Sequence, residues 1–89
     1  TERFNVVTLK EVMEHLPNPL DTVRSITESL KPNGILVFDY ILGDGDGQDT
    51  IEAIEQRPDV LRFISHHFNV IEGQLLIDSS MDRTVCRLK

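Results

Sequence analysis

Two almost continuously apolar runs, separated by one amphipathic segment, constrain the fold of this chain most strongly. The runs are "NVVTL" at residues 5–9 and "ILVFDYIL" at residues 35–42. Apolar side chains at consecutive positions are typical of strands in a parallel sheet that is covered on both faces. The segment between the runs has the length of the crossover that two parallel strands require. The sequence therefore predicts a strand, a helix and a strand in an α/β fold.

The intervening helix has recognisable start and stop signals. Asn18 is placed to cap a helix, and Pro19 suits the first helical position. Apolar residues then recur with the helical period as far as Leu30. The segment "KPNG" at residues 31–34 should end the helix, because proline cannot continue it and Asn-Gly tolerates positive φ. Before this helix, "KEVMEHL" at residues 10–16 is expected to form one helical turn.

The second half of the chain predicts further helix and then a change to antiparallel strands. Residues 49–68 fit one helix interrupted near Pro58, or two short helices. His66 and His67 fall at the end of this helix, where a cation suits the helix dipole. Residues 68–80 and 83–89 predict two strands joined by the turn "SSMD", with Cys86 packed in the last strand.

Composition excludes several classes of partner. At 89 residues the chain is at most one small domain, and its net charge of −6 provides no basic surface for nucleic acid or anionic lipid. A single cysteine cannot form an internal disulfide, and no apolar run has the length of a membrane span. We expect a cytoplasmic protein with a small-molecule partner, and with no nucleic-acid or membrane partner.

Three motifs between Phe4 and Tyr40 carry a resemblance to a known family. "EVMEH", then "PNP", then "LKPNG" follow one another at characteristic distances, with a strand before the first and after the last. The segment resembles the second half of the class I S-adenosylmethionine-dependent methyltransferases. The resemblance implies a partial Rossmann-like fold with parallel strands, a C-terminal antiparallel hairpin and helices on the faces. We expect residues 1–89 to be the C-terminal half of such a domain, without the N-terminal glycine-rich cofactor loop, and to be inactive alone.

The resemblance also implies roles for individual residues. Leu9 and Lys10 take the positions that contact S-adenosylmethionine, largely through the backbone, although Lys10 fits a solvated residue after a strand equally well. His15 would be the catalytic base that removes the proton of the acceptor. Asp39 and Tyr40 end the second strand, where acceptor contacts are common. A buried Asp39 needs a partner, so it either bonds a backbone group or faces a cleft.

Glu11, Glu14 and His15 form an E-x-x-E-H motif. On one helical turn these side chains would project to the same side and could converge on a divalent ion such as Mg²⁺. The motif is similar to the metal-binding motif of the ubiquinone-pathway O-methyltransferases. Other family members carry it without a metal, and in those His15 packs or lines the acceptor pocket.

The loop "GDGDGQDTIEAIE" at residues 43–55 resembles a ligand site only at first sight. A calcium loop starting at Asp44 would need glycine at its sixth place, which Asp49 occupies, and a helix before it. A phosphate would be repelled by the aspartates. We expect an acidic lid that follows the second strand and faces the acceptor.

Two functional hypotheses remain open from the sequence. The first is a methyltransferase that acts on a small-molecule acceptor through a hydroxyl group. The second is a non-catalytic α/β module that associates with a partner through an open sheet edge at residues 5–9. Under either hypothesis, we expect this edge to associate with a second copy of the chain or with the missing N-terminal half.

Overall fold

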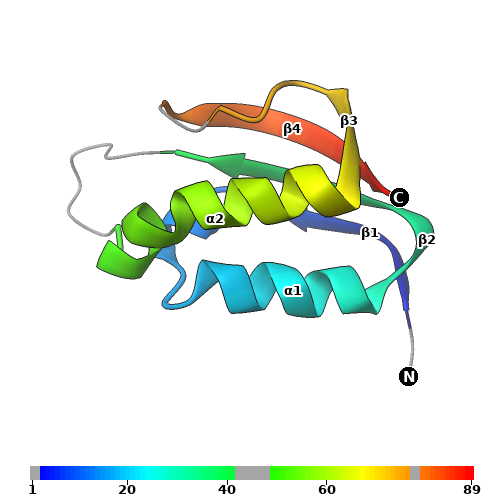
Figure 1. Cartoon of the computed structure of the whole chain (residues 1–89), viewed down its shortest axis with the longest axis horizontal. Coiled ribbons are helices and arrows are strands. Elements are labelled where there is room, and N and C mark those ends of the chain that lie inside the picture. Colours follow the sequence, from blue (N-terminus) through cyan, green and yellow to red (C-terminus); the bar gives the residue numbers. More distant parts are fainter. Residues whose placement is uncertain (1–2, 42–48, 77–78) are drawn as a thin grey trace.

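The computed structural model describes residues 3–41, 49–76 and 79–89. Within this part, one four-stranded sheet has the strand order β1-β2-β4-β3, and the helices lie along it (Figure 1). The elements in chain order are β1 (Phe4–Leu9), the 3₁₀ helix η1 (Met13–His15), α1 (Pro19–Ser29), β2 (Leu30–Tyr40), α2 (Ile51–His67), β3 (Phe68–Glu72) and β4 (Met81–Leu88).

The predicted α/β fold is confirmed. β1 and β2 are parallel neighbours, with Leu9 opposite Phe38, and the chain between them forms α1. β4 pairs antiparallel with both β2 and β3, so the last strand lies inside the sheet. The carboxyl ends of β1 and β2 therefore meet at one edge of the sheet, beside the start of β4.

The start of α1 follows the sequence signals, but β2 begins earlier than predicted. Asn18 Oδ1 accepts a hydrogen bond from the Asp21 backbone N–H at 3.4 Å. The helix ends at Ser29, and β2 includes the "KPNG" segment as an irregular start, with Asn33 at φ 64° and a register shift against β1. This register shift accommodates the additional residues of β2, which a regular strand could not pair with β1. Gly34 is required there, because a Cβ atom would lie 2.8 Å from the Lys31 carbonyl oxygen.

α2 is a single helix that passes through Pro58. The Thr50 hydroxyl caps its start by accepting from the Ala53 N–H at 2.9 Å. Proline removes one hydrogen bond from the ladder, and the buried side chains of Val60 and Ile64 hold the following turns against the sheet. Of the two predicted alternatives, the single helix is therefore correct, but the interruption expected near Pro58 does not occur.

The antiparallel strands differ from the prediction in their limits. β3 ends at Glu72, just before Gly73, which has φ 89°. β4 begins at Met81, so "SSMD" is not a tight turn between two long strands but leads directly into β4. Within the described part of this connection, Leu75 packs against the core, whereas Leu76 is exposed.

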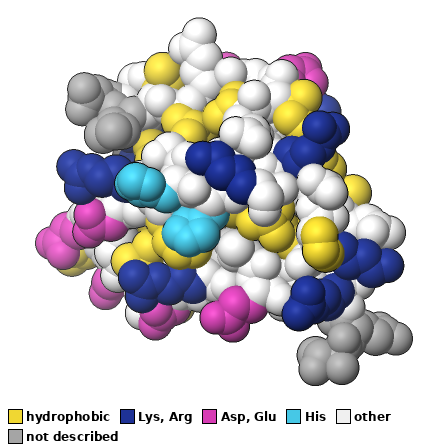
Figure 2. All heavy atoms as spheres, turned by 45° about the vertical axis from the view of Figure 1, so that its right-hand side comes forward, with side chains coloured by type: hydrophobic (Ala, Val, Ile, Leu, Met, Phe, Trp, Pro, Cys, Tyr) yellow, Lys and Arg dark blue, Asp and Glu magenta, His cyan; other side chains and the backbone are white. Residues whose placement is uncertain are grey.

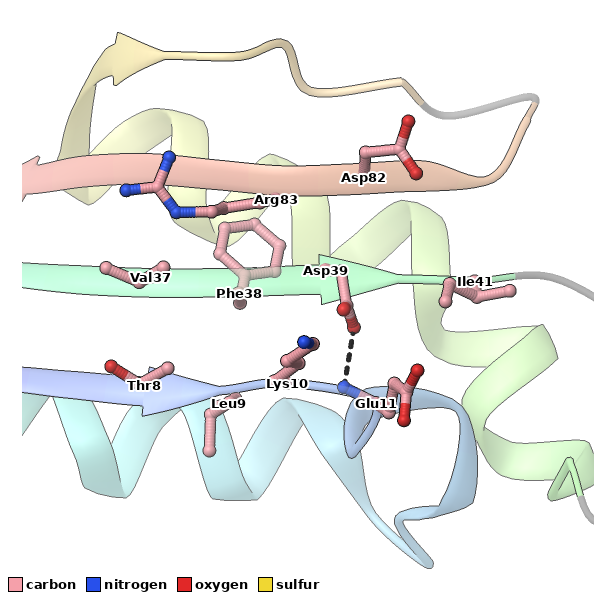
Figure 3. A pocket seen from close by; sticks show the side chains of 10 residues that line it. All are labelled: Thr8, Leu9, Lys10, Glu11, Val37, Phe38, Asp39, Ile41, Asp82 and Arg83. Atoms are coloured by element: carbon pink, nitrogen blue, oxygen red, sulfur yellow. Dashed lines mark hydrogen bonds between the residues drawn. The ribbon is translucent and has the colours of Figure 1, made fainter.

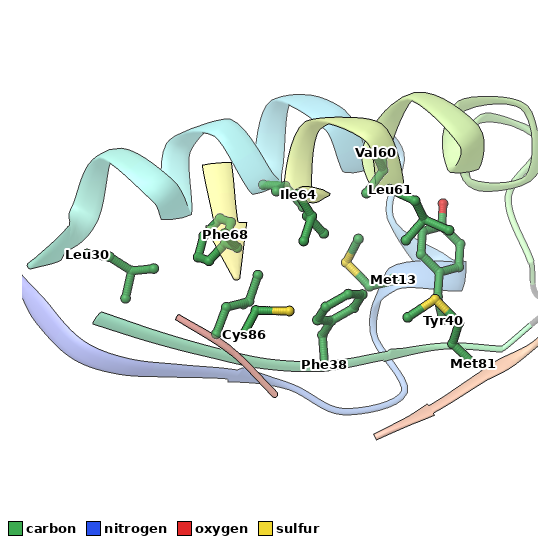
Figure 4. Close-up of a cluster of buried hydrophobic side chains, with 12 residues drawn as sticks. Met13, Leu30, Phe38, Tyr40, Val60, Leu61, Ile64, Phe68, Met81 and Cys86 are labelled. Carbon is green, nitrogen blue, oxygen red and sulfur yellow. The ribbon is translucent and has the colours of Figure 1, made fainter. Parts of the chain in front are cut away.

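The hydrophobic core lies between the helices and one face of the sheet (Figure 4). β2 contributes alternate residues to it, and β4 contributes Met81 and Cys86. The fully or almost fully buried members are Met13, Val23, Leu30, Leu36, Phe38, Tyr40, Val60, Leu61, Ile64, Phe68, Met81 and Cys86.

β1 is an edge strand, and only one of its faces is packed in the described part of the chain. Val7 and Leu9 pack against the core, whereas Phe4 and Val6 are 52% and 54% exposed. The prediction that this strand is covered on both faces was wrong for the described residues, because α1 and α2 lie on the same side of the sheet.

Neither α-helix in the described residues is long and apolar enough to cross a membrane.

Candidate functional site

An open pocket of about 530 Å³ lies at the carboxyl ends of β1 and β2 (Figure 3). Open α/β sheets bind ligands at this edge. The pocket combines an apolar floor with acidic and basic side chains at its rim. Its lining residues are Thr8, Leu9, Lys10, Glu11, Val37, Phe38, Asp39, Ile41, Asp82 and Arg83.

A hydrogen bond ties the two parallel strands together at the pocket. The Glu11 backbone N–H donates to Asp39 Oδ1 at 2.9 Å (Figure 3). Asp39 is only 7% exposed, and Glu11 has φ 56°, in the left-handed region that favours glycine. Of the two predicted possibilities for Asp39, the structure therefore shows both: it bonds a backbone group and lines the pocket.

The predicted cofactor residues, Leu9 and Lys10, both line the pocket. Leu9 is half-buried and packs against the core, and Lys10 is exposed. Their position at the end of β1 suits contacts through the backbone, since the paired strand ends immediately before Lys10. The contact with a cofactor itself remains a prediction.

Glu14 lies beneath this edge of the sheet in an environment that disfavours its charge. It is 4% exposed, and its Oε1 atom has no hydrogen-bond partner among the described residues. Burial raises the pKa of the Glu14 carboxyl, and the negative charges of Asp39 and Asp49 add to this rise, against the opposing effects of a backbone hydrogen bond and of His15. The Glu14 carbonyl oxygen accepts from the Thr50 N–H at 2.9 Å, which joins η1 to the start of α2.

The E-x-x-E-H motif does not form the predicted helical turn. Only Met13–His15 is helical, and Glu11 lies outside it in a left-handed conformation. Glu11 is exposed and Glu14 is buried, so the two carboxylates lie in different environments. No group of three or more His, Cys, Asp or Glu side chains in the described ranges could hold a metal ion. The expected Mg²⁺ site therefore does not fit the arrangement of these residues.

Tyr40 does not line the pocket, contrary to its predicted contact with the acceptor. Side chains alternate along a strand, so Asp39 and Tyr40 point to opposite faces of β2. The Tyr40 ring is fully buried in the core (Figure 4), and its hydroxyl donates to the Ala53 carbonyl oxygen. The Arg57 guanidinium lies 5.2 Å from the centre of the ring. Tyr40 therefore anchors α2 to the sheet.

His15 ends η1 and is half-buried, close to the pocket in sequence but not among the residues that line it. Its backbone N–H donates to the Val12 carbonyl oxygen at 3.0 Å. His66 and His67, by contrast, lie in the last turn of α2, where the His67 ring stacks on Phe63 at 4.2 Å. These two histidines are at the opposite end of the sheet, because β3 follows them and pairs with the end of β4.

Figure 2 turns the end of the molecule opposite the pocket toward the viewer. Lysine and arginine side chains surround histidines on this surface, with acidic side chains at its border. The cations are partly neutralised by neighbours, as in the exposed pair of Arg62 and Asp59 at 3.0 Å. The predicted position of the histidines is confirmed by the helix itself, since both lie in its last turn and His67 Nδ1 lies 2.9 Å from the Phe63 carbonyl oxygen.

The sequence reasoning missed the contribution of β4 to the pocket. Asp82 and Arg83 line it from this strand, and Arg83 Nη1 also lies 3.2 Å from Glu72 Oε1. Antiparallel pairing places the start of β4 beside the end of β2, with Thr84 opposite Phe38. That pairing, applied to the predicted strands, would have pointed to these two residues. The glycine-rich loop at residues 43–48 and its predicted role as a lid lie outside the described residues.

Comparisons with known proteins agree with this architecture. A family model described as a methyltransferase domain matches residues 1–78. The ubiquinone biosynthesis O-methyltransferase of Histophilus somni (strain 2336) is 48% identical over 40 residues, which are 45% of this chain and 17% of that protein. Its counterpart from Actinobacillus pleuropneumoniae serotype 5b (strain L20) is 45% identical over 40 residues, with the same shares.

A solved structure extends the likeness to almost the whole chain. The N-methyltransferase NodS from Bradyrhizobium japonicum WM9, in complex with S-adenosyl-L-homocysteine, superposes with a TM-score of 0.64 at 15% identity. The superposition covers 98% of this chain and 47% of NodS, so the chain has the fold of less than half of that protein. With the family model matching most of its length, the chain belongs to the class I S-adenosylmethionine-dependent methyltransferase family.

Proposed function

We propose that this chain forms the acceptor-side part of a methyltransferase domain, and that the complete domain methylates a hydroxyl group of a small molecule. The pocket at the carboxyl ends of β1 and β2 carries this proposal. It lies where open α/β sheets bind ligands, and the predicted cofactor residues line it. The O-methyltransferase names of the relatives support a hydroxyl acceptor.

S-adenosylmethionine would supply an electrophilic methyl group next to the acceptor. Leu9 and Lys10 would hold the cofactor along the end of β1, and Asp39, Asp82 and Arg83 would contact polar groups at the rim. The apolar floor would exclude water from the acceptor. Since the pocket is open in this chain, the remaining wall would come from an N-terminal half.

His15 would remove the proton of the acceptor hydroxyl as the methyl group is transferred. Imidazole accepts protons near neutral pH, which suits a general base. His15 is half-buried at the end of η1, four positions after the last of the consecutive pocket-lining residues Leu9–Glu11. No metal enters this proposal, because the E-x-x-E-H residues do not converge.

Calorimetric titration of S-adenosyl-L-homocysteine tests the cofactor assignment. The titrations use residues 1–89 alone and a longer polypeptide that completes the methyltransferase domain ahead of Thr1. We expect binding to the longer polypeptide and much weaker binding to the chain alone. Absence of binding to both would overturn the proposed function.

Methyl transfer to simple phenols and catechols by the completed domain tests the role of His15. His15→Gln should lower kcat by about 100-fold or more, as expected for the loss of a general base, and leave the affinity for S-adenosyl-L-homocysteine unchanged. His66→Gln is the matched control, since His66 is exposed at the far end of α2. Equal kcat values for the two variants would exclude His15 as the base.

The second candidate is a binding module that associates through the β1 edge. The exposed side chains of Phe4 and Val6 favour it, together with an apolar groove that β1 forms with Ile26 of α1. Light scattering of residues 1–89 separates the two candidates when combined with the titrations. A defined dimer without cofactor binding in either polypeptide would support the binding module, and a stable monomer would count against it.

A further inference from the structure

We propose that Asp39 is a positioning residue: its carboxylate holds the backbone at Leu9–Glu11 in the conformation that the pocket requires. The proposal rests on the proposed function for its role in cofactor binding, but the hydrogen bond on which it depends can be tested alone. Asp39 and Glu11 come from neighbouring strand ends and are separated by 28 positions in the sequence. The bond joins the end of β2 directly to the segment that follows β1.

Glu11 shows why this segment needs support. Its φ of 56° lies in a region that residues other than glycine rarely adopt, and glutamate has no special tolerance for it. Such conformations persist only where the surrounding structure holds them, and they cluster at functional sites. Glu11 is exposed, so packing of its own side chain does not hold it.

Asp39 has the properties of the group that provides this support. It interrupts an otherwise apolar run in β2, and at 7% exposure its carboxylate is a costly group to place there. A carboxylate that accepts a backbone N–H forms a stronger bond than a neutral acceptor. The Glu11 N–H bond is the one that the structure gives to Asp39 among the described residues. Its position on the pocket face of β2 brings the carboxylate to the loop after β1 and not into the core.

The backbone that Asp39 holds is the part of β1 that lines the pocket. Leu9, Lys10 and Glu11 are consecutive residues of the lining (Figure 3). If their contacts with the cofactor are made through the backbone, the conformation at Glu11 sets the direction in which these backbone groups point. A backbone segment that is already fixed lowers the entropic cost of ordering it when the cofactor binds. Asp39 would then act on cofactor affinity through this backbone, in addition to any contact of its own at the rim of the pocket.

A positioning role predicts a different ranking of variants from a role as catalytic base. Asp39→Asn keeps a carbonyl oxygen that can accept from the Glu11 N–H, whereas Asp39→Ala removes the acceptor. We therefore expect Asp39→Asn to stay close to the wild type and Asp39→Ala to bind the cofactor more weakly while kcat changes little. A catalytic base would be lost in both variants.

Amide hydrogen exchange of residues 1–89, measured by NMR, tests the bond without any cofactor. The Glu11 amide should be protected in the wild type, and Asp39→Ala should speed its exchange by about tenfold, the effect of losing one charge-assisted hydrogen bond. Asp59→Ala, which removes an exposed carboxylate of α2, is the matched control and should leave Glu11 unchanged. An unprotected Glu11 amide in the wild-type chain would overturn the proposal even if Asp39→Ala failed to fold.

Affinity of the completed domain for S-adenosyl-L-homocysteine tests the consequence. We expect Asp39→Ala to weaken binding by about tenfold and to raise KM for the cofactor with little change in kcat, and Asp39→Asn to restore both values. Glu11→Gly in the Asp39→Ala background should recover part of the affinity, because glycine adopts positive φ without strain. Equal affinities of the wild type and Asp39→Ala would overturn the role in binding. If the wild type bound no cofactor, the proposed function would fail, while the exchange measurement would still decide the bond.

Discussion

Alkaline titration of Tyr40 offers the sharpest test of the core, because this residue is the single tyrosine of a chain without tryptophan. Its ring is fully buried, and burial raises the pKa of the hydroxyl to about 12, against a smaller opposing effect of Arg57. The unfolded chain loses this proton near the ordinary value of 10, so the folded state binds more protons between the two values. The free energy of unfolding should therefore fall as the pH rises through this interval. A difference of two units corresponds to a loss of about 3 kcal/mol, which is complete above the higher value.

Ultraviolet absorbance of tyrosinate and far-ultraviolet circular dichroism, recorded on the same samples, measure this linkage. We expect tyrosinate to form only as the helical signal is lost, at a pH above that of a free tyrosine. In Tyr40→Phe the alkaline loss of stability should shrink, although the variant should be about 1 kcal/mol less stable at neutral pH, because the bond to the Ala53 carbonyl is gone. Tyrosinate that formed near pH 10 in a chain that stayed folded would refute the assignment of Tyr40 to the core.

Three further substitutions test other parts of the fold, each by urea denaturation. Glu14→Gln should raise stability at neutral pH but not at acidic pH. Burial raises the pKa of Glu14 above its ordinary value of 4.5, so the folded state loses stability as the pH rises from 4.5 through the raised pKa, and glutamine removes this loss. Glu28→Gln on the exposed surface of α1 is the control. Thr50→Ala should lower stability by about 1 kcal/mol through the lost cap of α2, and an unchanged midpoint would contradict the cap. Gly34→Ala should also destabilise the chain, because the added Cβ meets the Lys31 carbonyl oxygen at 2.8 Å, and a neutral result would mean that the start of β2 can shift.

The elements that the sequence predicted well are those with strong local signals. The cap at Asn18 and the proline after it placed the start of α1 correctly. The two apolar runs predicted a parallel pair, which the register between β1 and β2 confirms. Their apolar composition also suggested cover on both faces, which β1 lacks in the described residues, because burial depends on what packs against the strand and not on the strand itself.

The site was predicted less completely than the fold. Position at the end of a strand was enough to bring Leu9, Lys10 and Asp39 to the pocket. The conformation of Glu11 could not be predicted, because a positive φ at glutamate depends on the distant Asp39 and has no local signal. The helical turn expected for the E-x-x-E-H motif failed for this reason, since Glu11 leaves the helical region before η1 begins.

The end of β2 joins the two faces of the sheet, because consecutive residues there point in opposite directions. Asp39 faces the pocket and holds the loop after β1, whereas Tyr40 faces the core and holds the first turn of α2. Glu14 lies between these two attachments, with its carbonyl bonded to Thr50 at the start of the same helix. The segment from Glu11 to His15 is therefore fixed at one end through Asp39 and at the other through the start of α2. Any ligand that moves the loop after β1 must act against both attachments, which favours a site whose shape is set before binding.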